Sequence, residues 1–224
     1  MHRGQRERGR FNADYDDESI RAGNCALAKN SQANLDAGVY NDETGHFLKS
    51  IGEPAVSAPE EPSQIIPGVT NYQAALLVGA GASPPPPFWH FVAGTFDDNG
   101  IPINLSYIKD RVWFDVLQNI PPHNPMKGTL DGNVMFCGQT PVPFTKHLDQ
   151  IEVPILAMGA AGRFGKTIHY TAGLTASKDV TKVTVQLFPD DEAGLDFGHA
   201  DTVLATNAQT LVWKPILEWV VAHR

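Results

Sequence analysis

The sequence predicts an α/β fold, in which helices flank a parallel β-sheet. The prediction rests on the C-terminal third of the chain. A continuous apolar run at residues 153–159 ends in a glycine-rich exit, which is typical of a strand buried on both faces of a parallel sheet. A second strand-like run follows at residues 182–188, with a helical stretch within residues 167–176 between them. Strand, helix and strand in this order form the βαβ unit of parallel sheets.

Composition and charge fit a water-soluble globular protein and exclude some partners. The chain has 224 residues, of which 42% are apolar and 19% charged. Its 25 acidic and 17 basic residues give a formal net charge of −8. Because phosphate neutralisation requires clustered Lys and Arg, we expect no nucleic-acid partner. The apolar runs are too short to span a bilayer and no signal peptide is recognisable, so we expect no membrane span and a cytoplasmic location.

Residues 1–67 are predicted to form a polar, helical N-terminal segment that ends in a Pro-rich linker. A helix is expected from Asp16 to Gly38, where apolar residues recur on one face, and a shorter one from Asn41 to Ile51. Residues 53–67 contain four prolines between glutamates and serines, which indicates an extended linker. Cys25 and Cys137 are too few for a disulfide framework, so two free thiols are the favoured interpretation and one disulfide is the alternative.

Residues 68–150 form a second predicted segment. Thr70 and Gln73 have the spacing of a capping box, so a helix should begin there and end near Gly79 or Gly81. An aromatic-rich strand is possible over residues 88–97, and the Asp-Asn-Gly that follows is turn chemistry. Asp110 is expected to cap another helix, which Pro121 and Pro122 terminate. Its predicted buried stripe is Trp113, Val116, Leu117 and Ile120.

Residues 151–224 carry the motifs that resemble a known family. Ile-x-Val-Pro-Ile-Leu-x-x-Gly, from Ile151 to Gly159, is similar to the penultimate sheet strand of the α/β-hydrolases. Asp-Phe-Gly-His-Ala-Asp, at residues 196–201, resembles their terminal histidine loop, and residues 213–220 resemble their closing helix. The match covers about a third of the chain. The fold expected from it is a partial α/β-hydrolase-like parallel sheet, with the Pro-rich helical segments as a cap or lid.

The resemblance implies a catalytic triad in the order nucleophile, acid, histidine. His199 matches the histidine and would act as general base. The acid is open, because no carboxylate follows Gly159 directly. Asp97 is the first choice, with a turn residue as its alternative interpretation, and Asp131 is the second. Asp201 is expected instead to cap the short helix that follows it.

The nucleophile motif of the family, Gly-x-Ser-x-Gly, does not occur in the sequence. Ser83 is followed by proline, which removes the amide that an oxyanion hole requires. Cys137 precedes a glycine but is a poor match to the motif and reads as an inert buried thiol. The early strands of the fold are missing as well, so we expect a chain that begins in the middle of a hydrolase.

The other histidines and the glycines near residue 160 predict no cofactor or metal site. The histidines lack metal-ligand spacing, and each is expected to be solvated or hydrogen-bonded. Gly159, Gly162 and Gly165 do not have the dinucleotide-loop spacing. The aromatic residues that could line an acyl pocket, although core positions are the commoner role, are Phe88, Trp89, Phe91 and Trp113.

Two functional hypotheses follow from the sequence. In the first, the chain is a serine-type hydrolase of small-molecule carboxylic esters or related acyl bonds, with His199 as base and no cofactor. In the second, it is a truncated, non-catalytic hydrolase fragment that acts as a binding or oligomerising module. A partial sheet leaves an unpaired edge, so this second hypothesis predicts a homodimer or a partner strand that covers the edge.

Overall fold

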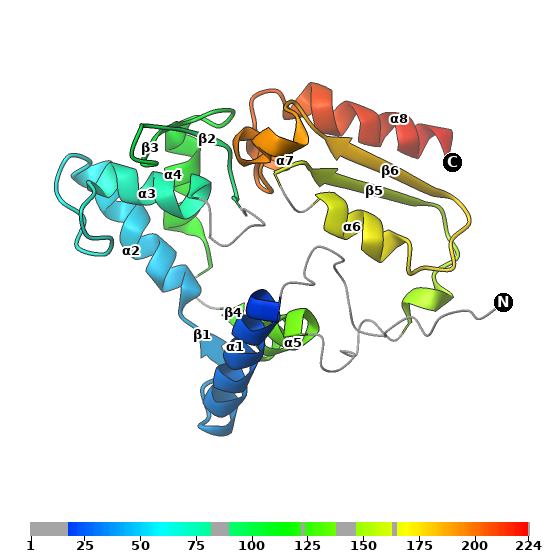
Figure 1. The fold of residues 1–224 in the computed structure, drawn as a ribbon, viewed down its shortest axis with the longest axis horizontal. Helices are drawn as coiled ribbons and strands as arrows, with labels where there is room; N and C mark the ends of the chain where they lie inside the picture. The colour runs from blue at the N-terminus through cyan, green and yellow to red at the C-terminus, as the bar shows by residue number, and fades with distance from the viewer. Residues whose placement is uncertain (1–17, 82–89, 122–123, 138–146, 163–164, 224) are drawn as a thin grey trace. The chain divides into compact units, whose positions relative to one another are not determined.

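A computed structural model describes residues 18–81, 90–121, 124–137, 147–162 and 165–223 (Figure 1). These residues form helices and three two-stranded sheets, which agrees with a mixed α and β class. The sheets are smaller than the parallel sheet that the sequence predicts. Of the helices described, none has the length and apolarity to cross a bilayer.

The chain divides into two compact units that interleave along the sequence. The first unit comprises residues 1–43, 123–155 and 170–180, and the second comprises residues 44–122, 156–169 and 181–224. Each unit is therefore assembled from segments that are distant in sequence. The contiguous division at residues 67 and 150 remains a prediction.

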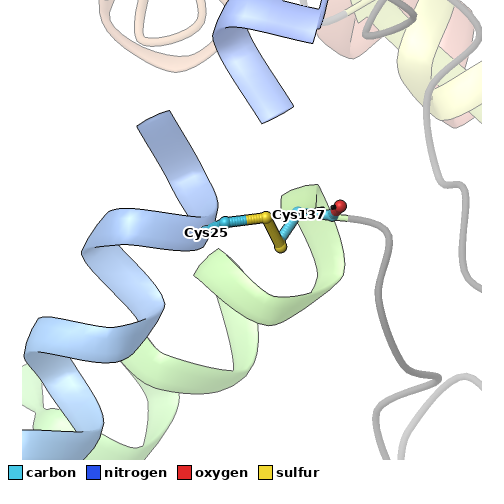
Figure 2. The surroundings of a disulfide bond; sticks show 2 residues. All are labelled: Cys25 and Cys137. Atoms are coloured by element: carbon cyan, nitrogen blue, oxygen red, sulfur yellow. Dashed lines mark hydrogen bonds between the residues drawn. A yellow bond between two sulfur atoms is a disulfide. The ribbon is translucent and has the colours of Figure 1, made fainter. Parts of the chain in front are cut away.

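The first unit is built on two helices, α1 (Glu18–Asp36) and α5 (Met126–Cys137), which pack against each other. α1 falls inside the helix predicted for residues 16–38, and Gly38 lies in the left-handed region with φ of 83° just after it. Cys25 on α1 and Cys137 on α5 form a disulfide, with Cα atoms 4.8 Å apart (Figure 2). The expectation of two free thiols is wrong, because the packing of the helices brings together residues 112 positions apart.

A short antiparallel ladder connects the two helices of the first unit. β1 (Asn41–Asp42) pairs with β4 (Asn124–Pro125), and the Thr129 hydroxyl donates to the Asp42 carboxylate at 2.5 Å. The helix expected from Asn41 therefore starts later, after this strand. The 3-10 turn η3 (Leu148–Gln150) also belongs to this unit.

Three helices form the larger hydrophobic core of the second unit: α2 (Thr44–Ser57), α3 (Asn71–Ala80) and α4 (Asp110–Asn119). α2 continues through Pro54, so the extended linker predicted from residue 53 begins too early. The reason is packing. Gly52 lies so close to α4 that a Cβ there would be 2.7 Å from the Leu117 Cβ, and tertiary burial outweighs the helix-breaking tendency of proline.

The predicted capping box at the start of α3 is confirmed. The Thr70 hydroxyl accepts from the Gln73 amide at 3.2 Å, and the Gln73 side chain accepts from the Thr70 amide at 3.0 Å. At α4 the N-cap is Lys109 and Asp110 is the first helical residue, so the predicted Asp110 cap is displaced by one position. The Asp110 carboxylate accepts from the Tyr72 hydroxyl at 2.5 Å instead.

A hairpin of β2 (Gly94–Phe96) and β3 (Pro102–Leu105) packs beside these helices. Its turn contains the predicted Asp-Asn-Gly, and Gly100 adopts φ of 76°. β2 is shorter than the strand suggested for residues 88–97, and residues 88 and 89 lie outside the described part of the chain.

The C-terminal part of the chain contains the predicted strand, helix, strand order, mostly within the second unit. β5 (Ile155–Ala160) and β6 (Val180–Val185) are neighbours, with α6 (Gly165–Ala172) between them in sequence (Figure 1). The strands are parallel, because the amides of Ile155 and Ala161 donate to the carbonyls of Asp179 and Val185, with the same offset in the same direction. The βαβ unit of the sequence prediction is thus present, although the strand over residues 182–188 ends three residues early.

Short helices follow β6, and a longer one closes the chain. They are η4 (Asp190–Leu195), α7 (Asp201–Leu204), the π-helix η5 (Gln209–Trp213) and α8 (Lys214–Ala222). η5 and α8 meet directly before Pro215. A second hydrophobic cluster lies here, and its buried residues are Ala160, Val185, Phe197, Ala205, Ala208 and Val212.

Candidate functional site

The histidine loop, residues 196–201, lies after β6 in the second unit. Four of its six side-chain positions are buried, namely Asp196, Phe197, Gly198 and Asp201. His199 is exposed. The loop therefore exposes the imidazole of His199, whereas most of the other loop residues are buried.

Asp196 anchors the start of this loop. Its fully buried carboxylate accepts from the Leu187 amide at 2.9 Å, the Phe188 amide at 3.0 Å and the Phe197 amide at 2.6 Å. Three backbone donors compensate the desolvation of a buried charge. They also fix the direction in which the chain turns from β6 into the histidine loop.

Residues 90–93 run beside the histidine loop and hold its second half. The His199 amide donates to the His90 carbonyl at 3.4 Å, and the Ala200 amide donates to the Phe91 carbonyl at 2.6 Å. A Cβ at Gly198 would lie 2.7 Å from the Phe91 backbone, so only glycine permits this approach. The glycine of the Gly-His motif thus serves close backbone contact.

Asp201 connects residues 90–93 to the histidine loop through buried hydrogen bonds. It is fully buried, and its Oδ2 accepts from the Ala93 and Gly198 amides, both at 2.7 Å. Burial raises the pKa of this carboxyl to about 6; the two amide hydrogen bonds oppose the rise and the charge of Asp196 adds to it. The expectation that Asp201 caps α7 is wrong, because its side chain turns back to Gly198, before the helix.

His90 is a buried member of the site that sequence reasoning left among the ordinary histidines. Its Nε2 lies 2.7 Å from the Asp196 carbonyl oxygen, and since a carbonyl only accepts, Nε2 carries the proton. Gly162 completes this corner, where its amide donates to the Phe197 carbonyl at 2.9 Å and a Cβ would meet the His90 ring. His90 follows a run of prolines in the sequence, which gives no periodic signal for burial.

The exposed face of the site consists of the His199 imidazole and the Phe91 ring. The ring centroids are 6.4 Å apart with an interplanar angle of 70°, an edge-to-face arrangement. Phe91 is 51% exposed, whereas Trp113 is buried and donates through Nε1 to the Ala75 carbonyl at 2.8 Å. Of the aromatic residues considered for an acyl pocket, Trp113 is a core residue and Phe91 lies at the histidine; Phe88 and Trp89 lie outside the described residues.

Asp97 lies at the hairpin turn of the same unit. Its carboxylate accepts from the Asn99 amide at 2.9 Å and from the Ile101 amide at 2.8 Å, which is the turn role considered beside the acid role. A pairing of Asp97 with His199 stays a prediction. Asp131, the second choice, lies on α5 in the first unit and forms an ion pair with Lys127.

Of the two nucleophile candidates, the structure describes only Cys137. Cys137 is part of the disulfide of the first unit and carries no free thiol. Ser83 lies outside the described residues. In the part of the chain that the structure describes, no group of three or more His, Cys, Asp or Glu side chains could hold a metal ion.

Comparison with known proteins adds no relative. No family model, curated protein or solved structure matches the chain.

Proposed function

We propose that this chain is a hydrolase of the α/β class that acts on carboxylic esters or related acyl bonds, with His199 as general base. One observation carries the proposal. After a βαβ unit, a loop held by two buried carboxylates and by residues 90–93 exposes a single imidazole. Precise backbone support for one exposed proton carrier is what general-base catalysis requires.

The chemistry assigned to His199 is proton transfer. The imidazole accepts the proton of an attacking hydroxyl as the hydroxyl oxygen adds to the ester carbonyl carbon. It then returns that proton to the departing alkoxide oxygen. Asp97 is our proposed acid, and Phe91 is available to contact an apolar part of the substrate.

Hydrolysis of short-chain nitrophenyl esters tests the proposal. Replacement of His199 by Ala should lower kcat/KM by about 10²–10⁴-fold, the usual contribution of a general base. The matched control is His147→Ala, which removes another exposed histidine and should leave the rate unchanged. A fluorophosphonate followed by mass spectrometry identifies the nucleophile. Equal background rates in all three proteins, with no labelled residue, would sink the catalytic proposal.

A second candidate, an oligomerising module, is favoured by the exposed apolar face of the C-terminal helical segment. Its exposed apolar side chains recur at helical spacing: Trp213, Ile216, Leu217, Val220 and Val221. Exposed apolar surface of this kind marks interaction sites. We propose a second copy of the chain as the occupant.

Sedimentation equilibrium tests the second candidate. If the apolar face mediates dimerisation, Leu217→Glu should convert a dimer to a monomer, because it places a charge in a desolvated contact. Leu27→Glu on α1 is the control, since Leu27 is also exposed but lies on another helix. A monomeric wild-type protein would exclude this candidate and leave the hydrolase proposal untouched.

A further inference from the structure

Asp201 has an unusual environment for a buried carboxylate. Oδ2 accepts two backbone amides, whereas the equally buried Oδ1 has no hydrogen-bond partner among the described residues. An ionised carboxylate normally engages both oxygens when it is removed from water. Burial therefore disfavours the ionised form of Asp201, and the two amide hydrogen bonds to Oδ2 are the contacts that favour it.

Those two amides are the connection between the histidine loop and its support. One belongs to Ala93, whose carbonyl accepts from the Ser106 amide at 2.8 Å. The other belongs to Gly198, the residue directly before His199. On the other side, the Thr202 hydroxyl donates to the His199 carbonyl at 2.7 Å. The backbone of His199 is thus fixed from both directions, and Asp201 supplies the buried part of that restraint.

Several titratable groups face this carboxylate. Asp196 is the other buried acid of the loop, and its charge acts on Asp201. Tyr107 packs on Phe197 with ring centroids 4.9 Å apart, and the pKa of Tyr107 is raised by burial first and then by both carboxylates. His90 bonds the Asp196 carbonyl oxygen through Nε2. Burial and the charge of Asp196 favour a proton on Asp201, and the two amides oppose it.

We infer that Asp201 is a positioning residue whose ionised carboxylate holds the backbone of His199 against residues 90–93 and thereby places the imidazole for proton transfer. This inference rests on the proposed hydrolase function. Protonation of the carboxyl weakens the charge-assisted bonds to the Ala93 and Gly198 amides, so in mild acid the backbone of His199 is held less firmly while the carboxyl itself stays buried. Activity then requires two deprotonated groups, the Asp201 carboxyl and the His199 imidazole.

The pH profile of ester hydrolysis separates this role from a merely structural one. In the wild-type protein, log kcat/KM should fall in acid with a slope that approaches about two, because two protons inhibit. Asp201→Asn keeps an acceptor oxygen for the amides but cannot ionise, so its slope should approach about one. Its kcat at neutral pH should fall about tenfold with KM unchanged, since neutral hydrogen bonds are weaker than charge-assisted ones.

Two further variants complete the test. Asp201→Ala removes the acceptor and should lower kcat more than Asp201→Asn, so retention of part of the activity by Asn is the rescue expected of a positioning residue. Asp191→Asn removes an exposed carboxylate ten residues earlier in the sequence and should leave the acid slope and kcat as in wild type. An unchanged slope and kcat in Asp201→Asn, in a protein whose activity depends on His199, would overturn the inference while leaving the proposed function in place.

A measurement without substrate keeps the inference testable if the hydrolase proposal fails. The amide of Gly198 should exchange with deuterium about tenfold faster at pH 5 than expected from the intrinsic pH dependence alone, and Asp201→Asn should abolish this excess. The same exchange behaviour in both proteins would show that the Asp201 carboxylate does not control the loop.

Discussion

The two units of the molecule are stabilised by different means. In the second unit, large side chains such as Leu76, Leu117 and Phe197 are almost completely excluded from water. The buried apolar residues that the structure describes in the first unit are fewer: Ala28, Met126, Leu130, Cys137 and Ala172. The first unit instead has a covalent link between its two main helices. A segment with a small core commonly depends on such a crosslink, whereas a segment with a large core does not.

The largest expected loss of stability comes from a substitution in the core of the second unit. Leu76→Ala should lower the free energy of unfolding by about 2–5 kcal/mol, because the substitution removes buried methyl groups and leaves a cavity. Leu27→Ala on α1 is the matched control, since Leu27 is 52% exposed and should contribute less than about 0.5 kcal/mol. Urea unfolding followed by circular dichroism measures both. A loss of equal size in the two variants would contradict the contrast between the units.

The next effect concerns the disulfide of the first unit. Cys25→Ser should destabilise that unit by about 2–4 kcal/mol, because opening a crosslink across 112 residues increases the entropy of the unfolded chain. Amide hydrogen exchange should then accelerate in α1 and α5 while α3 and α4 keep their protection. Reduction of wild-type protein with dithiothreitol should reproduce the pattern, and it should have no effect on Cys25→Ser. Uniform loss of protection over both units would show that the crosslink supports the whole chain.

The same contrast explains which parts of the fold the sequence could predict. Local signals succeed where the chain is regular. The sequence predicts the capping box at Thr70, the Asp-Asn-Gly turn and the apolar strand that the structure has at residues 155–160. Each depends on residues within one turn or one strand. Long-range packing could not be predicted. The sequence around Cys25 does not indicate that α5 packs there, and the sequence around Pro54 does not indicate that α4 packs against α2.

The candidate site divides in the same way. The histidine loop could be located from its motif, and His199 is indeed its exposed side chain. His90 and the Ala93 partner of Asp201 could not be found, since they bond to loop residues more than 100 positions away in sequence. Only the tertiary structure identifies them. It shows that residue 198 has no space for a Cβ and that buried amides need an acceptor.

A smaller effect is expected at a polar contact of the second unit. The Tyr72 hydroxyl donates to Asp110, and burial, this hydrogen bond and the charges of Asp110 and Glu60 raise the pKa of Tyr72 to about 12. Tyr72→Phe should cost about 1.5 kcal/mol, because a charged acceptor loses its donor. Tyr40→Phe in the first unit, where the side chain is 70% exposed, should change stability very little. Equal unfolding midpoints for Tyr72→Phe and wild type would remove this contact from the difference between the units.

The pH dependence of that contact has a defined sign. The pKa of Tyr72 is higher in the folded than in the unfolded protein, so folding favours the protonated hydroxyl. The stabilising contribution is complete below the ordinary tyrosine pKa and is lost as pH rises toward about 12. Tyr72→Phe should therefore lack this alkaline loss of stability.

The smallest expected effect concerns the histidine loop, where the second unit buries the carboxyl group of Asp201 as well as apolar surface. The folded-state pKa of Asp201 is raised to about 6, so the folded protein binds the proton more tightly than the unfolded chain does. Its contribution is fully present below the ordinary aspartate pKa and is lost as pH rises through about 6. Ionised Asp201 thus lowers stability at neutral pH, where the proposed reaction needs it.

Acidification should therefore stabilise the second unit through this one group. Between pH 7 and pH 5, the free energy of unfolding of wild type should rise relative to that of Asp201→Asn by about 1 kcal/mol. The comparison with Asn cancels the titration of every other group that the two proteins share. Unfolding in urea at both pH values measures the difference, followed by tryptophan fluorescence because Trp113 is buried in this unit. A difference of zero would mean that the amides of Ala93 and Gly198 fully compensate the desolvation of the carboxylate. In that case the free energy of unfolding would not depend on the ionisation of Asp201. Any destabilisation that comes from holding His199 in place would then arise from its contacts with residues 90–93.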